Sequence, residues 1–252
     1  MSTPMELTWV GHATTLVDVG GYRVITDPLM TKRVAHLRRR RPLPSADLHE
    51  ADLILLSHVH LDHLHAPSLK RLRPTVDVLT PRGSGLLLRK AGFDRVQEVD
   101  VGDRITTGPV TVEVVPAAHK HGRGPHSRVT ARPVGYVVEG AGRRVYFPGD
   151  TDLFDAMADL TDIDAALLPI WGWGPTLGVG HLDPTRAATA TGLIRPSMVV
   201  PIHWGTYSPE DGRRQLPSWF EKPPELFEQA LTDASLRVRL HLLEPGGSVS
   251  LP

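Results

Sequence analysis

The chain has 252 residues, with 28 Lys and Arg against 28 Asp and Glu, 13 His and no Cys. The absence of cysteine excludes a disulfide framework, a thiolate zinc site and a cysteine nucleophile, so histidine and carboxylate would have to hold any transition metal. A formal net charge of zero gives no electrostatic reason to expect a nucleic-acid partner or a membrane-surface partner.

The first residues, Met1 to Glu6, lack the basic segment and apolar run of a signal peptide, and no apolar stretch approaches the ~18 residues of a membrane span. We therefore expect a cytoplasmic protein without a membrane span. No internal repeat or low-complexity linker divides the sequence, so residues 1–252 are expected to form one domain. Whether the chain forms a homo-oligomer stays open at this stage.

Short β-branched and aliphatic runs, closed by Gly, Pro, Asp or Ser, predict strands. They lie at residues 6–10, 14–19, 22–26, 53–56, 76–79, 110–115, 133–138, 144–147, 163–168 and 198–202. Helical patterns lie at residues 67–72, 84–91, 153–160, 184–192 and 223–232. Strands that first form hairpins and then alternate with helices predict a layered α/β fold with mixed sheets.

The segment 31–44 is strongly basic, because it contains Lys32, Arg33 and four consecutive arginines, Arg38 to Arg41. Runs of like charge are usually exposed, which favours a solvated loop. The alternative is a flap beside an active site that attracts an anionic, phosphate-bearing substrate.

A dense group of metal-compatible side chains follows the apolar run at residues 53–56. It reads Ser57-His58-Val59-His60-Leu61-Asp62-His63. Packing does not explain three imidazoles and a carboxylate within six residues, because burying polar groups without partners is costly. His58 and His60 can point to one side of an extended turn, while Asp62 and His63 serve a neighbouring position. The spacing predicts ligands for two adjacent cations.

The pattern His-x-His-x-Asp-His after a hydrophobic strand resembles the signature of the metallo-β-lactamase-fold hydrolases. Three downstream segments extend the resemblance in the family's order: Pro116-Ala117-Ala118-His119, Phe147-Pro148-Gly149-Asp150-Thr151 and Pro201-Ile202-His203-Trp204-Gly205. Two further segments resemble the branch of N-acylphosphatidylethanolamine phospholipase D-like and ascorbate-6-phosphate lactonase-like proteins: Trp9-Val10-Gly11-His12-Ala13-Thr14 and Asp183-Pro184 after His181. The resemblance implies a four-layer αββα sandwich of two mixed sheets flanked by helices, with the site at one edge.

The resemblance also implies a dinuclear metal site. It assigns His58, His60 and His119 to the first metal, Asp62, His63 and His203 to the second, and Asp150 to a bridge between them. Two divalent ions are expected, with Zn²⁺ the first choice, although the ligand types also suit Mn²⁺ or Fe²⁺. A hydroxide shared by both ions would be the nucleophile. Asp62 and His181 are the residues expected to be catalytic.

Several other histidines need separate interpretation. His121 competes with His119 for the third ligand position of the first metal, and we favour His119 because it follows Pro116-Ala117-Ala118. His121 and His126 then become candidates to line the substrate pocket. His12 is either a structural histidine or a group that hydrogen-bonds a ligand carboxylate. His181 is expected to orient the substrate or protonate the leaving oxygen.

The glycine-rich segment 171–180 contains Trp171 and Trp173, separated by one glycine. Glycines let a loop bend around a ligand, and indoles offer large apolar faces, so both tryptophans are predicted to contact substrate. The alternative is that both indoles fill the core.

The leading functional hypothesis is a dinuclear metallohydrolase acting on a phosphodiester or a phosphorylated small molecule. A lactonase or amidohydrolase with the same metals is the alternative. A third hypothesis is a metal-dependent binding protein without catalysis; the presence of all seven ligand positions argues against it.

Overall fold

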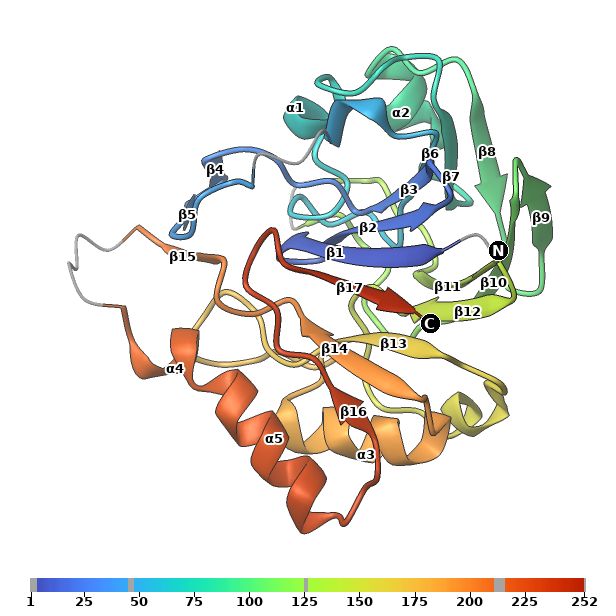
Figure 1. Ribbon diagram of the computed structural model, residues 1–252. Coiled ribbons are helices and arrows are strands. Elements are labelled where there is room, and N and C mark those ends of the chain that lie inside the picture. Colours follow the sequence, from blue (N-terminus) through green and yellow to red (C-terminus); the bar gives the residue numbers. More distant parts are fainter. Residues whose placement is uncertain (1–3, 45–47, 125–126, 211–215, 252) are drawn as a thin grey trace.

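The computed structural model describes residues 4–44, 48–124, 127–210 and 216–251. Two seven-stranded sheets pack face to face, with α1 and α2 outside one sheet and α3 and α5 outside the other (Figure 1). This arrangement confirms the predicted α/β class with mixed sheets.

The first sheet has the order β17-β1-β2-β3-β6-β7-β8. Its strands are β1 (Met5–Gly11), β2 (Thr14–Val19), β3 (Tyr22–Thr26), β6 (Leu53–Leu55), β7 (Asp77–Pro81), β8 (Val96–Val99) and β17 (Ser248–Leu251). Pairing is antiparallel from β17 to β3 and parallel from β3 to β8.

The second sheet has the order β16-β14-β13-β12-β11-β10-β9. Its strands are β9 (Arg104–Thr107), β10 (Val110–Pro116), β11 (Val134–Gly140), β12 (Arg143–Phe147), β13 (Ala165–Pro169), β14 (Met198–Ile202) and β16 (Arg239–Leu240). Pairing is antiparallel from β9 to β12 and parallel from β12 to β16.

A third, small sheet has the order β15-β5-β4. Its strands are β4 (Arg33–Val34), β5 (Leu37–Arg39) and β15 (Tyr207–Pro209). The helices are α1 (Ala66–Leu69), α2 (Gly85–Lys90), α3 (Pro184–Ile194), α4 (Ser218–Glu221) and α5 (Pro223–Asp233), with 3-10 turns η1 (Leu48–Glu50) and η2 (Asp155–Asp159). In the part of the chain that the structure describes, no helix is both long and apolar enough to cross a bilayer.

Strand β6 shows why the apolar run before the histidines is continuous. Leu53 and Leu55 pack into the core between the two sheets, whereas Ile54 and Leu56 pack into the core under α1 and α2. A strand buried on both faces needs apolar residues at every position. The first polar residue after this run, Ser57, therefore marks the point where the chain leaves the sheet.

The prediction of a loop at residues 31–44 is wrong for the residues that form β4 and β5. Val34 and Leu37 are buried beside Leu29 and Tyr207, and β5 pairs with β15. The hairpin was hidden because its apolar residues are few and separated by cations. The segment 153–160 is also not an α-helix, because only the 3-10 turn η2 forms there; the short elements β8, β9, β16, β17 and α4 lie outside the predicted ones.

Candidate metal centre

The loops after β6, β10, β12 and β14 meet at one edge of the sandwich. The first carries His58 to His63, and the others carry His119, Asp150 and His203. Asp183 caps α3 by accepting a hydrogen bond from Arg186 N, which fixes the chain just after His181. The fold thus gathers residues that lie up to 145 positions apart in the sequence, from 58 to 203.

The first candidate metal group consists of His58, His60, His119 and Asp150, whose ligand atoms lie within 4.8 Å of one another. His119 Nε2 lies 3.1 Å from His60 Nδ1 and 3.9 Å from Asp150 Oδ2. Nitrogen ligands on one tetrahedral ion lie about 3.4 Å apart when each bond is about 2.1 Å long, so the spacing of the two rings fits a shared cation.

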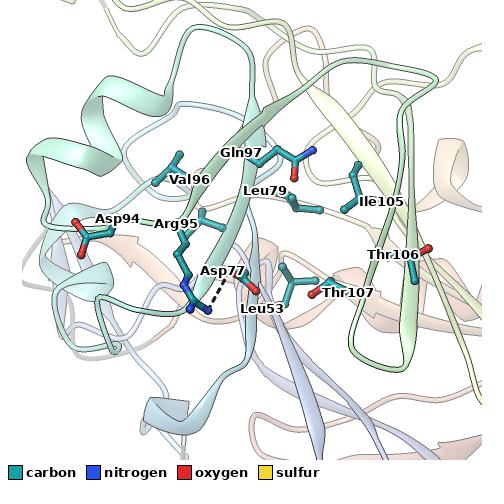
Figure 2. A pocket seen from close by; sticks show the side chains of 11 residues that line it. Leu53, Asp77, Leu79, Asp94, Arg95, Val96, Gln97, Ile105, Thr106 and Thr107 are labelled. Atoms are coloured by element: carbon teal, nitrogen blue, oxygen red, sulfur yellow. Dashed lines mark ion pairs between the residues drawn. The ribbon is translucent and has the colours of Figure 1, made fainter.

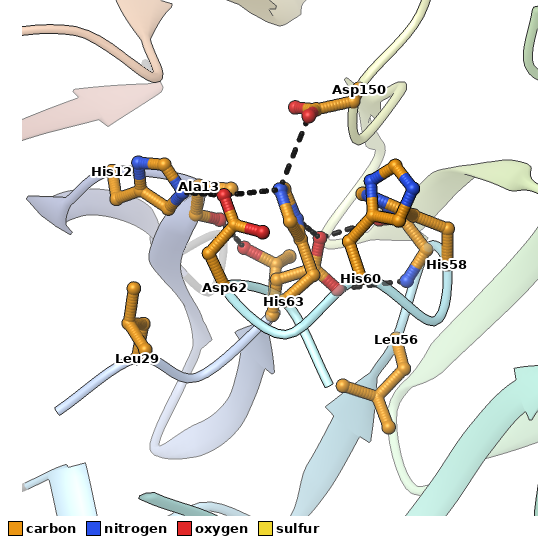
Figure 3. Close-up of polar contacts among 12 residues, drawn as sticks. His12, Ala13, Leu29, Leu56, His58, His60, Asp62, His63 and Asp150 are labelled. Atoms are coloured by element: carbon orange, nitrogen blue, oxygen red, sulfur yellow. Dashed lines mark hydrogen bonds and ion pairs between the residues drawn. The ribbon is translucent and has the colours of Figure 1, made fainter. Parts of the chain in front are cut away.

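The second candidate group consists of His12, Asp62, His63 and His203, also within 4.8 Å. His203 Nε2 lies 3.3 Å from His63 Nε2, and Asp62 Oδ2 lies 3.8 Å from the same nitrogen. Figure 3 shows the His63 ring between Asp62 and Asp150, with His12 on the far side of Asp62. His12 Nε2 lies 3.1 Å from Asp62 Oδ2.

Asp150 lies between the two groups. Its Oδ2 atom is 3.3 Å from His63 Nε2, and its Oδ1 atom is 3.0 Å from His203 Nε2. Together with the contact to His119, these distances place one carboxylate against both groups. Asp150 is 3% exposed, so water does not screen it.

Asp27 and Ser57 support the histidines from beneath, and sequence reasoning missed both. Asp27 Oδ2 accepts hydrogen bonds from His63 Nδ1 at 2.7 Å and from Ser57 Oγ at 2.5 Å. Because Ser57 Oγ donates its only proton to Asp27, it must accept from His58 Nδ1, 2.9 Å away. His58 Nε2 is then left as an unprotonated nitrogen facing the site.

The signal that could have found Asp27 is its position directly after β3, the strand beside β6. Carboxyl ends of parallel neighbours meet at one sheet edge, so an acid there lies next to the β6 loop. Asp27, His12 and His203 also have positive φ angles of 33°, 56° and 62°. Such backbone conformations are costly for residues other than glycine and gather at functional sites.

Burial keeps most of the imidazoles neutral. It lowers the pKa of His58 well below its usual range, lowers that of His60, and lowers that of His119 to about 4. Burial and the nearby His203 lower the pKa of His12 to about 3. Neutral imidazole is the form that binds a metal ion.

His63 behaves differently because three carboxylates surround it. Burial alone would lower the pKa of His63, but Asp150, Asp62 and Asp27 together raise it well above the ordinary value. Burial would raise the pKa of Asp150, yet His203 and His63 hold it well below its usual range. Three carboxylates thus place buried negative charge around His63, and either a proton on His63 or a bound cation would balance it.

Two buried atoms test whether a metal fits. His58 Nε2 and Asp150 Oδ1 have no hydrogen-bond partner among the described residues. Buried polar atoms are almost always satisfied, and both atoms are metal-ligand types that face the same groups. The residues present therefore fit divalent cations.

The predicted ligands lie in the two candidate metal groups, whereas most of the remaining described histidines do not. All seven predicted ligand positions lie in the two groups, and His12 joins them as a buried partner of Asp62. His121 is exposed and belongs to neither group, which favours His119. His181 Nε2 lies 3.5 Å from Asp150 Oδ2 at the open side of the centre. His126 lies outside the described residues.

The two tryptophans of segment 171–180 have different environments. Trp171 packs partly against the core, and its indole Nε1 donates to Gly174 O at 3.0 Å. Trp173 is 36% exposed and lies edge-on to His36, with ring centroids 5.1 Å apart. Only Trp173 thus presents an indole surface of the kind expected for substrate contact.

The arginine run is bonded to the protein's own backbone. Arg39 is nearly buried and donates to Val10 O at 2.6 Å and Leu29 O at 3.2 Å, with Tyr207 beside it. Arg41 donates to Gly205 O, and Arg38 pairs with Glu210. These contacts indicate that the arginine run stabilises the small sheet of β4, β5 and β15.

Comparison with known proteins places the fold in one class, the metallo-β-lactamase fold. A model of the beta-lactamase superfamily domain matches residues 22–204, which is most of the chain. The chain therefore belongs to the beta-lactamase superfamily, and it is a metal-dependent hydrolase of that superfamily.

Two curated relatives and one solved structure are similar to most of this chain. A UPF0173 metal-dependent hydrolase of Methanopyrus kandleri is 31% identical over 97% of this chain and 99% of its own length. N-acyl-phosphatidylethanolamine-hydrolyzing phospholipase D 1 of Caenorhabditis elegans is 33% identical, over 79% of this chain and 64% of that protein. Among solved structures, Igni18, a metallo hydrolase of Ignicoccus hospitalis, aligns with a TM-score of 0.76 at 25% identity, covering 99% of both chains.

Proposed function

We propose that the chain is a dinuclear metal-dependent hydrolase. His58, His60 and His119 hold one divalent ion, Asp62, His63 and His203 hold the other, and Asp150 contacts both. The observation that carries this proposal is the position of Asp150, with its oxygens 3.0 to 3.9 Å from nitrogens of both groups. Zn²⁺ is the first candidate, with Mn²⁺ and Fe²⁺ as alternatives.

Two divalent ions bound there would generate a nucleophile from water near neutral pH and polarise the oxygen of the scissile group. The remaining chemistry falls to this chain's own side chains. His181 is one of them: its imidazole is partly exposed, and its Nε2 lies 3.5 Å from Asp150 Oδ2. A partly exposed imidazole that holds a proton beside the centre can donate it to the leaving oxygen.

His12 has a positioning role in this proposal. Its ring lies against that of His203 at an interplanar angle of 36°, with centroids 3.9 Å apart, while its Nε2 faces Asp62 at 3.1 Å. A neutral His12 can donate one hydrogen bond to the Asp62 carboxylate and so fix the ligand oxygen. The same nitrogen is close enough to serve as a ligand instead, but only when it carries no proton and the hydrogen bond to Asp62 is lost.

The substrate is proposed to be a phosphodiester or a phosphorylated small molecule. The relation to a phospholipase D supports this class, since that enzyme's printed name describes hydrolysis of a phospholipid. The arginine run adds no support, because Arg39 and Arg41 are engaged with backbone carbonyls.

A lactone or amide is the second candidate substrate. Exposed apolar side chains on the two loops at the centre favour it: Leu61 is 45% exposed and Val179 is 80% exposed, in addition to Trp173. Such side chains suit an uncharged organic group better than a phosphate.

The decisive experiment measures metal and turnover together. Protein purified without added metal is analysed for elements, then supplied with Zn²⁺ or Mn²⁺ and assayed with bis(p-nitrophenyl) phosphate and with an aromatic lactone. About two ions per chain with phosphodiester turnover support the proposal. Two ions with lactone turnover alone select the second candidate, and failure to bind metal after supplementation contradicts both.

Replacing Trp173 with alanine tests the substrate contact. We expect the ratio of kcat/KM values for lactone and phosphodiester to change several-fold, with little change in melting temperature, since the indole is partly exposed. Trp171→Ala is the comparison variant, because its indole packs against the core and should lower the melting temperature instead. An unchanged substrate ratio in Trp173→Ala would remove that residue from the binding surface.

A further inference from the structure

One loop, residues 171–180, supports histidines of both metal groups through backbone carbonyls. His203 Nδ1 donates to Trp171 O at 3.0 Å, and His119 Nδ1 donates to Gly180 O at 2.6 Å. Between them, His181 Nδ1 donates to Gly178 O at 3.0 Å. A carbonyl can only accept, so each bond fixes the proton on Nδ1 and leaves Nε2 facing the centre.

The two ends of this loop act on different groups. The carbonyl of Trp171 orients His203 of the second group, and the carbonyl of Gly180 orients His119 of the first. The hydrogen bond from Trp171 Nε1 to Gly174 O closes the first turn of the loop, residues 171–174. The two ends belong to one continuous segment of backbone.

Gly180 is the position where this support leaves no space for a side chain. Its φ angle is +94°, which favours glycine, and a Cβ atom there would lie 2.9 Å from His119 Nδ1 and 3.4 Å from His119 Cα. A Cβ atom at Gly178 would have no atom within 4 Å. The loop therefore contains a tight glycine against a metal-group histidine and, two residues away, an unconstrained glycine.

We propose that the 171–180 loop is a shared positioning element for both metal groups, and that Gly180 sets the orientation of His119 by bringing its backbone into contact with that ring. The proposal rests on the dinuclear site proposed above. Partners that orient a ligating histidine typically contribute 10–100-fold to metal affinity, so the loop determines how tightly the first group binds its ion. Because Trp173 and Val179 on the same loop are exposed, a substrate that contacts them also contacts the element that orients His119 and His203.

The test compares Gly180→Ala with Gly178→Ala in the full chain. Zn²⁺ stoichiometry and affinity are measured by titration against a competing chelator, and Co²⁺-loaded protein is examined by visible absorption, which reports ligand geometry. We expect Gly180→Ala to weaken one of two ions by about 10–100-fold and to change the Co²⁺ spectrum. Gly178→Ala should bind both ions as the wild type does.

A further variant keeps the test decisive if Gly180→Ala does not fold. The double variant H119A/G180A lacks the ring that the new Cβ would meet, so it should fold, with a melting temperature below that of His119→Ala only by the strain of alanine at a φ angle of +94°. Circular dichroism and the melting temperature of the metal-free protein measure this. If the double variant also fails to fold, the contact with His119 is not the reason and the proposal is overturned.

The remaining outcomes are equally clear. Wild-type affinity for both ions in Gly180→Ala overturns the proposal, and so does an equal loss in Gly178→Ala. A wild-type chain that binds no more than one ion contradicts the dinuclear function itself, which is visible before any variant is compared.

Discussion

The metal centre and the outer edge of the sandwich, strands β7 to β9, both hold acidic and basic side chains, but in opposite environments. At the centre, Asp27, His63 and Asp150 are nearly inaccessible to water, and three carboxylates face one imidazole. At the edge, Asp77 pairs with Arg95 at 3.7 Å, and both side chains are exposed. Exposed pairs of this kind contribute little to stability.

The edge also has a pocket, and the metal centre shows why a pocket alone does not define a site. A cavity of about 420 Å³ lies between the two sheet edges, and its lining includes Leu53, Leu79, Ile105 and the Asp77–Arg95 pair (Figure 2). None of the four described buried side-chain atoms without a hydrogen-bond partner belongs to a residue lining it. Buried charge, rather than volume, distinguishes the candidate metal centre from this pocket.

The largest expected effect comes from Asp150→Asn, which keeps the side-chain volume and removes the charge facing both groups. We expect turnover to fall by on the order of 10³-fold and the content of both metals to fall, because the shared negative ligand is lost. Elemental analysis and steady-state kinetics measure the two effects.

The control for this variant is Arg95→Ala at the edge. It removes a charge from an exposed pair, so metal content and turnover should stay at wild-type values and the free energy of unfolding should change by less than about 0.5 kcal/mol. Full activity with two bound ions in Asp150→Asn would contradict the claim that charge at the metal centre matters more than charge at the edge.

The second prediction concerns the support beneath the centre. Asp27→Asn should weaken metal binding by about 10–100-fold, because His63 loses a charged acceptor, and should lower the free energy of unfolding by about 1–3 kcal/mol. Chelator competition and chemical denaturation measure these changes. Asp52→Asn is the control, since Asp52 accepts a hydrogen bond from Arg23 N but is partly exposed and precedes β6, whereas His58 follows it. Equal effects in both variants would contradict a specific role for Asp27.

The third prediction separates proton transfer from metal binding. His181→Ala should lower kcat by about 100-fold and leave two metals bound, because His181 faces Asp150 from the open side without completing either group. The matched control is His36→Ala, an exposed histidine beside Trp173, which should leave kcat unchanged. Loss of a metal in His181→Ala would make it a ligand, and wild-type kcat would leave it only a structural role.

Local signals in the sequence predicted most of the strands and the His58–His63 cluster. The two-sheet sandwich and the places of His119, Asp150 and His203 were implied by the resemblance of their segments to the metallo-β-lactamase-fold hydrolases. A strand buried on both faces is a continuous apolar run, and a cluster such as His58 to His63 has few explanations other than a metal. Class and family were confirmed by comparison. The ligand roles themselves stay predictions.

What the sequence could not reveal depends on distant contacts. Asp27 is one of many acidic residues, and its role depends on β3 lying beside β6, which only pairing in the folded chain establishes. Arg39 belonged to a run that indicated an exposed loop, yet it satisfies the carbonyls of Val10 and Leu29 inside the protein. Support through carbonyls, as from Gly180 to His119, leaves no side-chain signal at all.

The smallest expected effect lies at the edge and depends on pH. Glu98 accepts hydrogen bonds from Gly85 N and Gly83 N at 2.8 Å each, and these bonds lower its pKa below the ordinary value of 4.5 although slight burial opposes the change. A carboxyl whose pKa is lower in the folded state stabilises the protein above pH 4.5, and this contribution is lost as the pH falls through the folded-state pKa. Glu98→Gln should therefore be slightly less stable than wild type at pH 7, and the gap should close on acidification toward pH ~3.

Melting temperatures of both proteins at several pH values, taken with the metals removed, measure the gap. Metal content and turnover at pH 7 should not change in Glu98→Gln, because this carboxylate is partly exposed and its charge is balanced by hydrogen-bond donors and by nearby Arg89 and Arg82. A gap that stays constant from pH 7 to 3 would show that the charge of Glu98 is irrelevant. A loss of metal would show that the edge and the centre are coupled. The different burial of their charged side chains argues against such coupling.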